Sequence, residues 1–286
     1  MKTIISVNKI FYKINDKSIL NDINLDINLG DVFALIGKNG AGKTTLFEII
    51  LKDIRPTSGF VDFDNDMGVE FSNTGVAYDN PPLFPLLKVN EVVDYFSSIY
   101  GLKSSDIPTR YFDVFGLNEI LNSLISTLSQ GERKKVALFL SIIHNPKVLI
   151  LDEPFSNIDP TVIESIWKVL KENNRTIIFT SHNWYEIEQI ATKITFISKG
   201  NIILPPTSPQ EIIKSLPHSK KVIVDYNEDL IAKIKNFEYY INENLIHLFY
   251  DGNSELIDEI LKYSNNFSFK DCDIKDAYLL KTNDNE

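Results

Sequence analysis

Hydrophobic and polar residues alternate near the start of the chain. The clearest run places an apolar side chain at every second position: Ile23, Leu25, Ile27 and Leu29. A period of two is typical of a strand with one buried face. Residues 1–36 are therefore predicted to contain half-buried antiparallel strands.

Three later segments are almost entirely apolar and are followed by residues suited to ligand binding or catalysis. Val32–Ile36 runs into a glycine-rich stretch, Val148–Leu151 into two carboxylates, and Thr176–Phe179 into a serine and a histidine. Such runs are typical of buried strands in a parallel sheet, whose carboxyl ends carry ligand sites. Residues 194–198 and 202–204 predict a hairpin.

A helical region is predicted between the first and second of these strands. Apolar residues recur every three or four positions in residues 90–100, 117–128 and 137–143. This spacing is typical of helices with one buried face. We therefore expect a helical insert at about residues 85–145.

A proline-rich break, Pro205–Pro209, predicts a boundary between domains at 1–204 and 205–286. Ser208 and Pro209 suit the N-cap and first position of a helix at 210–215. The pattern that follows predicts a strand, a helix, two strands, a helix and a strand at residues 221–226, 228–236, 237–242, 245–251, 254–264 and 266–271. The predicted fold class is α/β, followed by a small α+β domain of βαββαβ order.

Composition narrows the class of protein. The 286 residues include 29 basic and 39 acidic ones, a formal net charge of −10. This balance disfavours a broad nucleic-acid surface, which needs clustered Lys and Arg. The one cysteine, Cys272, fits a reducing, cytoplasmic compartment and is expected to be structural. No apolar stretch is long enough to span a bilayer, so we expect any membrane role to act through a partner.

The glycine-rich stretch after the strand at 32–36 predicts a phosphate-binding loop. It consists of Gly37, Lys38, Asn39, Gly40, Ala41, Gly42, Lys43 and Thr44. Glycines let backbone N–H groups wrap around an anion, and the following helix adds the positive end of its dipole. Lys43 is expected to reach the β- and γ-phosphates of a nucleotide, and the Thr44 hydroxyl to bind Mg²⁺. A plain glycine turn is the alternative.

Two carboxylates and a histidine follow the next apolar runs. Asp152 is suited to the Mg²⁺ shell, and Glu153 to orienting an attacking water. His182 ends a strand predicted beside Asp152, where it would contact the γ-phosphate. The alternatives are an acidic strand-end turn and a structural histidine. We expect no role for the other histidines, His144, His218 and His247.

Another anion-binding arrangement is predicted where a Ser/Gly turn, within Leu128–Lys135, opens a helix. Taken alone, this segment is better explained as a simple N-cap. Its meaning depends on the segments around it.

Together these segments resemble the ATP-binding subunits of ABC transporters. Gly37–Thr45 matches the Walker A loop, and Val148–Glu153 the Walker B strand with its catalytic glutamate. Leu128–Glu132 is similar to the LSGGQ motif, with Gln130 and Glu132 in place of Gly and Gln. Ser156–Asp159 resembles the D-loop, and His182 the switch histidine. Five motifs agree in order over residues 1 to about 204.

The resemblance implies a mixed sheet with antiparallel N-terminal strands, and a dimer that sandwiches two ATP molecules. In one subunit, ATP would be bound by the loop residues from Gly37 to Thr45. Residues of the opposite subunit would complete that site: Ser129, Gln130, Gly131 and Asp159. Phe11 is the expected adenine-stacking residue, with Tyr12 close behind. Glu153 and His182 would be catalytic. The implied cofactors are ATP and Mg²⁺, the metal being held by Thr44, Asp152 and Asp79.

One position departs from the family. Its members usually have a glutamine in the loop that touches Mg²⁺ and couples to the membrane subunit. Asp79 aligns with that glutamine. A carboxylate can still bind Mg²⁺, and it repels ATP when the metal is absent. The adjoining Pro82–Pro85 segment predicts either an apolar dock for a membrane partner or a buried turn.

Residues 206–286 are more loosely similar to the C-terminal extension of ABC-2 type exporters. We therefore expect an ATPase, peripheral at the inner face of the cell membrane, that forms a homo- or heterodimer and drives a separate transmembrane subunit in export. One alternative is a soluble ABC-type ATPase with a non-transport role. The other is a regulatory subunit that binds ATP as a switch; Asp79 favours it, whereas Glu153 and His182 disfavour it.

Overall fold

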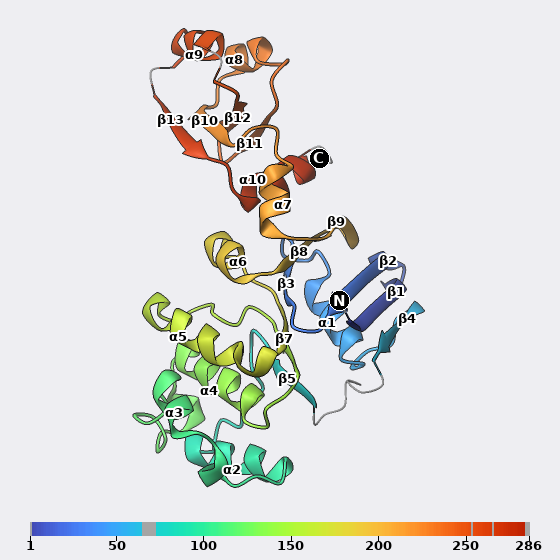
Figure 1. Cartoon of the computed structure of the whole chain (residues 1–286), viewed down its shortest axis with the longest axis vertical. Helices are drawn as coiled ribbons and strands as arrows, with labels where there is room; N and C mark the ends of the chain where they lie inside the picture. The colour runs from blue at the N-terminus through green and yellow to red at the C-terminus, as the bar shows by residue number, and fades with distance from the viewer. Residues whose placement is uncertain (1, 65–72, 253, 265, 284–286) are drawn as a thin grey trace. The chain divides into compact units, whose positions relative to one another are not determined.

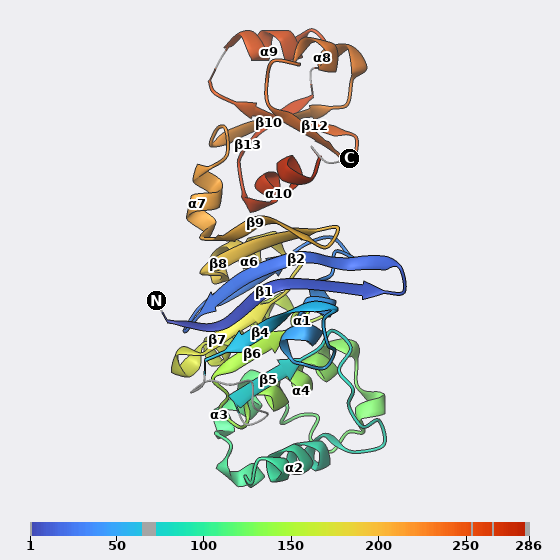
Figure 2. The ribbon, with the colours of Figure 1, turned by 90° about the vertical axis from the view of Figure 1, so that its right-hand side faces the viewer.

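The computed structural model describes residues 2–64, 73–252, 254–264 and 266–283. The chain divides into two compact units, Met1–Pro206 and Thr207–Glu286. Figures 1 and 2 show the elements of each unit from two sides. Because the two units are separate bodies, each is described by itself.

A six-stranded sheet organises the first unit, in the order β5-β6-β7-β3-β8-β9. Its strands are β5 (Thr74–Ala77), β6 (Val148–Leu151), β7 (Thr176–Phe179), β3 (Val32–Ile36), β8 (Lys193–Ser198) and β9 (Asn201–Thr207). The pairs β5–β6, β6–β7, β7–β3 and β3–β8 are parallel. The three predicted apolar strands are thus confirmed as neighbours in one parallel sheet. The two-residue turn at Lys199 and Gly200, both with positive φ, joins β8 to β9 as expected of a hairpin.

A three-stranded antiparallel sheet, β2-β1-β4, forms a second layer. Its strands are β1 (Thr3–Ile14), β2 (Lys17–Asn28) and β4 (Ser58–Phe63). The predicted alternation is confirmed at Ile23, Leu25 and Ile27, which are buried. It is wrong at Leu29, which is 45% exposed because β2 ends at Asn28 and the chain turns there.

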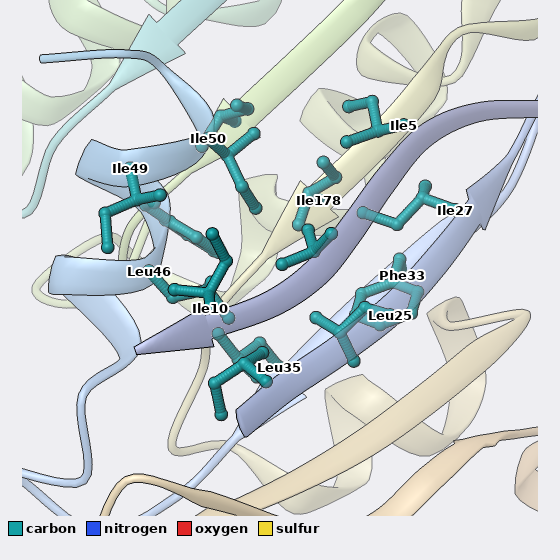
Figure 3. Close-up of a cluster of buried hydrophobic side chains, with 14 of the residues drawn as sticks. Ile5, Ile10, Leu25, Ile27, Phe33, Leu35, Leu46, Ile49, Ile50 and Ile178 are labelled. Atoms are coloured by element: carbon teal, nitrogen blue, oxygen red, sulfur yellow. The ribbon is translucent and has the colours of Figure 1, made fainter. Parts of the chain in front are cut away.

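The core of the first unit lies between these sheets and α1 (Lys43–Ile50). Figure 3 shows side chains of α1 directed toward Ile5 and Ile10 of β1 and Ile178 of β7. Burying an aliphatic side chain stabilises the fold by about 1.5–3 kcal/mol. This shared core holds α1, and therefore the loop before it, against the parallel sheet.

The predicted helical insert contains α2 (Val89–Ile99), α3 (Thr109–Val114) and α4 (Gln130–Ile142). Figures 1 and 2 show α2 and α3 together at the end of this unit opposite β9. The helix predicted at 117–128 is wrong: the segment is a series of turns with one 3₁₀ turn, Ile125–Thr127. Its apolar spacing arises because turns bury the same residues, among them Leu117 and Ile125. Two further helices, α5 (Pro160–Leu170) and α6 (Trp184–Ile190), complete the unit.

The second unit has the βαββαβ order expected from the sequence. It contains β10 (Lys220–Asp225), α8 (Glu228–Lys233), β11 (Tyr239–Asn242), β12 (Leu245–Tyr250), α9 (Ser254–Leu261) and β13 (Phe267–Asp271). The strands form an antiparallel sheet in the order β11-β12-β10-β13. Figure 2 shows α8 and α9 on one side of this sheet and α10 (Ile274–Asn283) on the other.

The helix predicted at 210–215 is confirmed as α7 (Pro209–Lys214). Ser208 is its N-cap and accepts the Glu211 N–H at 3.3 Å, and Pro209 is its first residue. Cys272 is buried, and burial raises the pKa of its thiol to about 12. The thiol therefore stays protonated at neutral pH, as expected of a structural cysteine.

Candidate functional site

The phosphate loop lies between β3 and α1, in the strand–loop–helix setting that the sequence predicts. Gly42 is the N-cap of α1 with φ 105°, a value that favours glycine. A Cβ at Gly42 would lie 2.6 Å from a Leu20 methyl carbon, so the loop is also closely packed. The first turn of α1 contains no acidic residue. Its N–H groups and dipole are therefore available to an anion.

Lys43 is buried, 8% exposed, and folds back over the loop. Its ammonium donates to the carbonyl oxygens of Gly37 at 2.7 Å and Lys38 at 3.4 Å. Burial lowers the pKa of Lys43, whereas the nearby carboxylates of Glu153 and Asp152 oppose that shift. The charge is thus positioned beside the anion-binding backbone of the loop.

Asp152 follows the last residue of β6 and is the centre of a hydroxyl network. The Thr44 hydroxyl donates to Asp152 Oδ2 at 2.8 Å. The Thr180 hydroxyl, just after β7, donates to Asp152 Oδ1 at 2.6 Å. The parallel pairing of β6 with β7 explains why strand ends 28 residues apart meet here.

Glu153 is held in an unusual backbone conformation, with φ 48°. Its N–H donates to the Thr180 hydroxyl at 2.9 Å, and its carbonyl accepts from the Lys134 ammonium at 2.5 Å. Burial raises the pKa of Glu153, opposed mainly by His182 and Lys43. The side chain is therefore a better base than an exposed glutamate.

The carboxylate of Glu153 faces His182. Glu153 Oε1 lies 3.2 Å from His182 Nε2, close enough for an ion pair. Among the described residues, Oε1 has no hydrogen-bond partner, although it is buried. A buried acceptor in this position is suited to a water or substrate atom. The His182 side chain is 58% exposed.

The oxygen atoms around Asp152 fit Mg²⁺. A hydroxyl and a carboxylate are hard ligands, and Mg²⁺ commonly takes one or two protein ligands together with substrate phosphates and water. Among the described residues, no group of three or more His, Cys, Asp or Glu is arranged to hold a metal. The donors at this place are thus one carboxylate, Asp152, and one hydroxyl, Thr44.

The predicted partner-site residues lie at two exposed helix starts. Ser129 is the N-cap of α4 and accepts the Glu132 N–H at 3.2 Å. Asp159 is the N-cap of α5 and accepts the Thr161 N–H at 2.9 Å; this bond lowers the pKa of Asp159. Gly131 packs against the D-loop segment, where a Cβ would lie 2.3 Å from the Asn157 carbonyl oxygen. Ser129, Gln130 and Asp159 are exposed.

Asp79, expected as a metal ligand, contacts a cation of the protein itself. Its Oδ1 accepts from the Lys134 ammonium at 2.7 Å and from the Ser156 hydroxyl at 3.2 Å. Sequence reasoning missed Lys134. Its helical spacing with Leu138 and Ser141, both buried, was the available signal, since these positions share a face of α4.

The two candidates for adenine stacking differ in their surroundings. Phe11 and Tyr12 are both half-buried on β1. Tyr12 packs against the hydrophobic core of the first unit. Phe11 pairs with Ser58 of β4. Phe11 therefore remains the better candidate.

A cavity of about 450 Å³ lies beside the segment that contains Asp79. Most of its lining is apolar and includes Tyr78, Pro81, Leu83, Phe96, Tyr100 and Leu140. The ring of Phe84 lies 6.5 Å from that of Phe96 in the lining and is 42% exposed, and Leu86, two residues further along the chain, is 83% exposed. The buried-turn interpretation of Pro82–Pro85 is therefore wrong, because most of this segment is at the surface. In the described part of the chain, no helix is long and apolar enough to cross a membrane.

Comparison with known proteins adds independent evidence. The family profile described as "ABC transporter" matches residues 20–156. The lantibiotic transport ATP-binding protein SrtF of Streptococcus pyogenes is 34% identical over 196 residues, covering 66% of this chain and 84% of SrtF. The uncharacterized ABC transporter ATP-binding protein MJ1023 of Methanocaldococcus jannaschii is 29% identical over 252 residues, covering 86% of each chain.

The fold also matches solved structures. One is cbiO1 of Clostridium perfringens, described as part of the ABC transporter complex cbiONQ. It is 27% identical, with a TM-score of 0.62, and the match covers 82% of this chain and 96% of cbiO1. The α/β fold predicted from the sequence is thereby confirmed.

Proposed function

The chain belongs to the ATP-binding proteins of ABC transporters, and from this membership we propose how its residues divide the work. Members of this family bind and hydrolyse ATP to power transport through a separate membrane partner, and this chain is such an ATPase. One observation carries the assignment of the site: Lys43, Thr44, Asp152 and Glu153, whose Oε1 has no hydrogen-bond partner among the described residues, meet at one edge of a parallel sheet.

ATP is proposed to bind with its phosphates on the loop and its adenine on Phe11. The backbone N–H groups of Gly37–Thr45 and the Lys43 ammonium would hold the β- and γ-phosphates. To do so, Lys43 must exchange its carbonyl contacts to Gly37 and Lys38 for phosphate oxygens. A charge-assisted bond to phosphate is stronger than one to a neutral carbonyl, so the exchange is favourable.

Thr44 and Asp152 are the proposed holders of Mg²⁺, which supplies neutralising charge to the phosphates when bound. Asp79 is the third proposed ligand. Glu153 orients and deprotonates the attacking water through Oε1, the oxygen without a hydrogen-bond partner. His182, 3.2 Å from that oxygen, senses the γ-phosphate. Each role asks only for position and charge, which is what phosphoryl transfer needs.

The exposed helix starts are the proposed contribution to a second copy or a related subunit. Ser129, Gln130, Gly131 and Asp159 would contact the ATP held by the opposite loop. The start of α4 offers N–H groups and its dipole to the phosphates. ATP would thus be the bridge that closes the dimer, and its hydrolysis would release it.

The cavity beside Tyr78 and Leu83 is the proposed dock for the transmembrane partner. Its apolar lining and the exposed Phe84 and Leu86 suit an apolar segment of another protein. We propose export as the direction of transport, because residues 206–286 are loosely similar to the C-terminal extension of ABC-2 type exporters. Such an arrangement would place the chain at the inner face of the cell membrane.

Two substitutions test the ATP site. Lys43→Ala should abolish binding of a fluorescent ATP analogue, because it removes the buried cation of the loop. Glu153→Gln should retain binding, lose at least about 100-fold in turnover, and accumulate an ATP-bound dimer in size-exclusion chromatography. Equal turnover in wild type and Glu153→Gln would refute the role of Glu153.

Affinity purification from detergent-solubilised native membranes tests the partner. A multi-span membrane protein should copurify in stoichiometric amount with wild type and be lost with Leu83→Asp. Tyr185→Asp is the control, since Tyr185 is 76% exposed on α6 and does not line the cavity. Soluble partners alone would contradict the transport role.

A further inference from the structure

Lys134 is a buried lysine that no motif of the family accounts for. It lies in the second turn of α4 and is 4% exposed. Its ammonium donates to three oxygens: Asp79 Oδ1 at 2.7 Å, the Glu153 carbonyl at 2.5 Å, and the Ser156 hydroxyl. A lysine has three N–H donors, and all three are used. The buried charge is thus fully satisfied.

These three acceptors belong to three different segments around the ATP site. Asp79 follows β5, Glu153 follows β6, and Ser156 begins the D-loop. Ser156 also donates to Asp79 Oδ1 at 3.2 Å, which closes a ring of contacts around the ammonium. Lys134 therefore ties α4 to the loop after β5 and to the catalytic turn.

The contact with Glu153 has a specific consequence. A left-handed conformation at a residue other than glycine costs about 1–3 kcal/mol and persists only when its surroundings enforce it. At Glu153, with φ 48°, the N–H bonds to Thr180 and the carbonyl accepts from Lys134. The carbonyl also accepts from the Ser156 N–H at 3.4 Å, so Lys134 is one of three hydrogen-bond partners that hold the backbone of Glu153, and it makes the shorter of the two bonds to the carbonyl.

Asp79 is what makes a buried lysine tolerable here. An ammonium removed from water without a counter-ion is strongly unfavourable, and the Glu153 carbonyl and Ser156 hydroxyl are neutral. Asp79 supplies the negative charge at 2.7 Å. The same loop continues into Tyr78, Pro81 and Leu83 at the cavity. A displacement of that loop would therefore move the charge that holds Lys134.

We propose that Lys134 is a positioning residue for Glu153, and that the Asp79–Lys134 ion pair connects the cavity-lining loop to the conformation of the Glu153 peptide. The inference rests on the proposed catalytic role of Glu153. It assigns Asp79 a function that does not require contact with the metal, namely counter-ion to Lys134.

Lys134→Gln tests the positioning role. We expect kcat for ATP hydrolysis to fall about 10- to 100-fold, since a displacement of about 1 Å can cost that much. The Kd for a fluorescent ATP analogue and the KM should change by less than about threefold, because the phosphate loop is untouched. Lys134→Arg, which keeps the charge and donors, should recover part of the loss.

Lys171→Gln is the matched control. Lys171 is half-buried and, like Lys134, donates to a backbone carbonyl, that of Ile190 at 3.3 Å. It should keep wild-type kcat. Loss of kcat to the same extent in both variants, or a raised Kd without a change in kcat for Lys134→Gln, would overturn the proposal.

The ion pair is tested in nucleotide-free protein by thermal unfolding. Asp79→Asn and Lys134→Gln should each lower the Tm, and the double variant should lose less than the sum, because the partners depend on each other. Additive losses would refute the coupling. Glu153→Gln separates a failure of the positioning role of Lys134 from a failure of the catalytic role of Glu153. If Glu153→Gln abolishes ATP turnover and Lys134→Gln leaves it unchanged, the positioning role of Lys134 is refuted and the role of Glu153 stands. If Glu153→Gln hydrolyses ATP at the wild-type rate, the proposed function itself is refuted.

Discussion

Asp276→Asn should destabilise the second unit, so that it unfolds locally more often, and should leave the stability of the first unit unchanged. Asp276 is fully buried at the start of α10. Its carboxylate accepts from the Lys221 ammonium, from the Tyr240 hydroxyl at 2.5 Å and from the Asp273 N–H at 2.7 Å. The substitution removes the negative charge and leaves the buried Lys221 without its counter-ion.

The expected magnitude follows from these contacts. Breaking a buried ion pair by removing one partner costs about 3–5 kcal/mol. Asparagine retains one oxygen that can accept from Tyr240 or Lys221, so the lower figure applies. A loss of about 3 kcal/mol corresponds to a roughly 100-fold larger population of the opened form.

Cys272 makes this opening measurable. It is the one cysteine of the chain and is buried directly before α10, in the second unit. At pH 8, under conditions where closing is faster than labelling, the rate of reaction with a thiol reagent reports the opened population. We expect about a 100-fold faster rate for Asp276→Asn. Fluorescence of Trp167 and Trp184, both in the first unit, should report an unchanged urea midpoint.

Two variants separate the ion pair from other effects. Asp271→Asn removes an equal charge beside Cys272, but Asp271 is exposed on β13, so the labelling rate should stay within about threefold of wild type. Replacing the whole network with Lys221→Met, Asp276→Leu and Tyr240→Phe should restore slow labelling, because apolar side chains of similar volume need no partners. Unchanged labelling in Asp276→Asn would refute the reasoning.

Two further predictions concern packing and pH. Ile178 is 1% exposed between the two sheets, and Ile178→Ala should lower the free energy of unfolding by about 2–5 kcal/mol. The urea midpoint read by tryptophan fluorescence should fall accordingly, whereas Leu86→Ala, at a position 83% exposed, should change it little. Equal shifts in the two variants would contradict the packing argument. Burial lowers the pKa of both His144 and His247 from 6.5 to about 4. The unfolded chain therefore takes up protons first as pH falls, and stability should drop between pH 6.5 and 4 by about 1 kcal/mol per histidine after discounting for partial exposure. His144→Phe should flatten the pH dependence of the first unit, and an unchanged slope would refute this cause.

The sequence predicted the parts of this molecule in which local pattern and tertiary setting agree. The apolar runs before Gly37, Asp152 and Ser181 are buried strands because parallel strands are covered on both faces. The functional side chains that follow these strands lie close together because the strands are neighbours in the sheet. The helix predicted at residues 117–128 is wrong for the opposite reason. Turns bury Leu117 and Ile125 as thoroughly as a helix would, so the spacing alone did not distinguish the two.

Lys134 shows what motif reasoning leaves out. A motif records which residue types meet the nucleotide, whereas the groups that hold those residues come from other segments and have no fixed spacing. Asp79 is a proposed metal ligand because it occupies the place of a metal-contacting glutamine. In the fold, Asp79 accepts a hydrogen bond from Lys134, which lies 55 residues away in the sequence. A neutral glutamine could not serve as the counter-ion of a buried ammonium. The aspartate at position 79 and the lysine at position 134 therefore form one feature, in which the carboxylate supplies the charge that the buried ammonium needs.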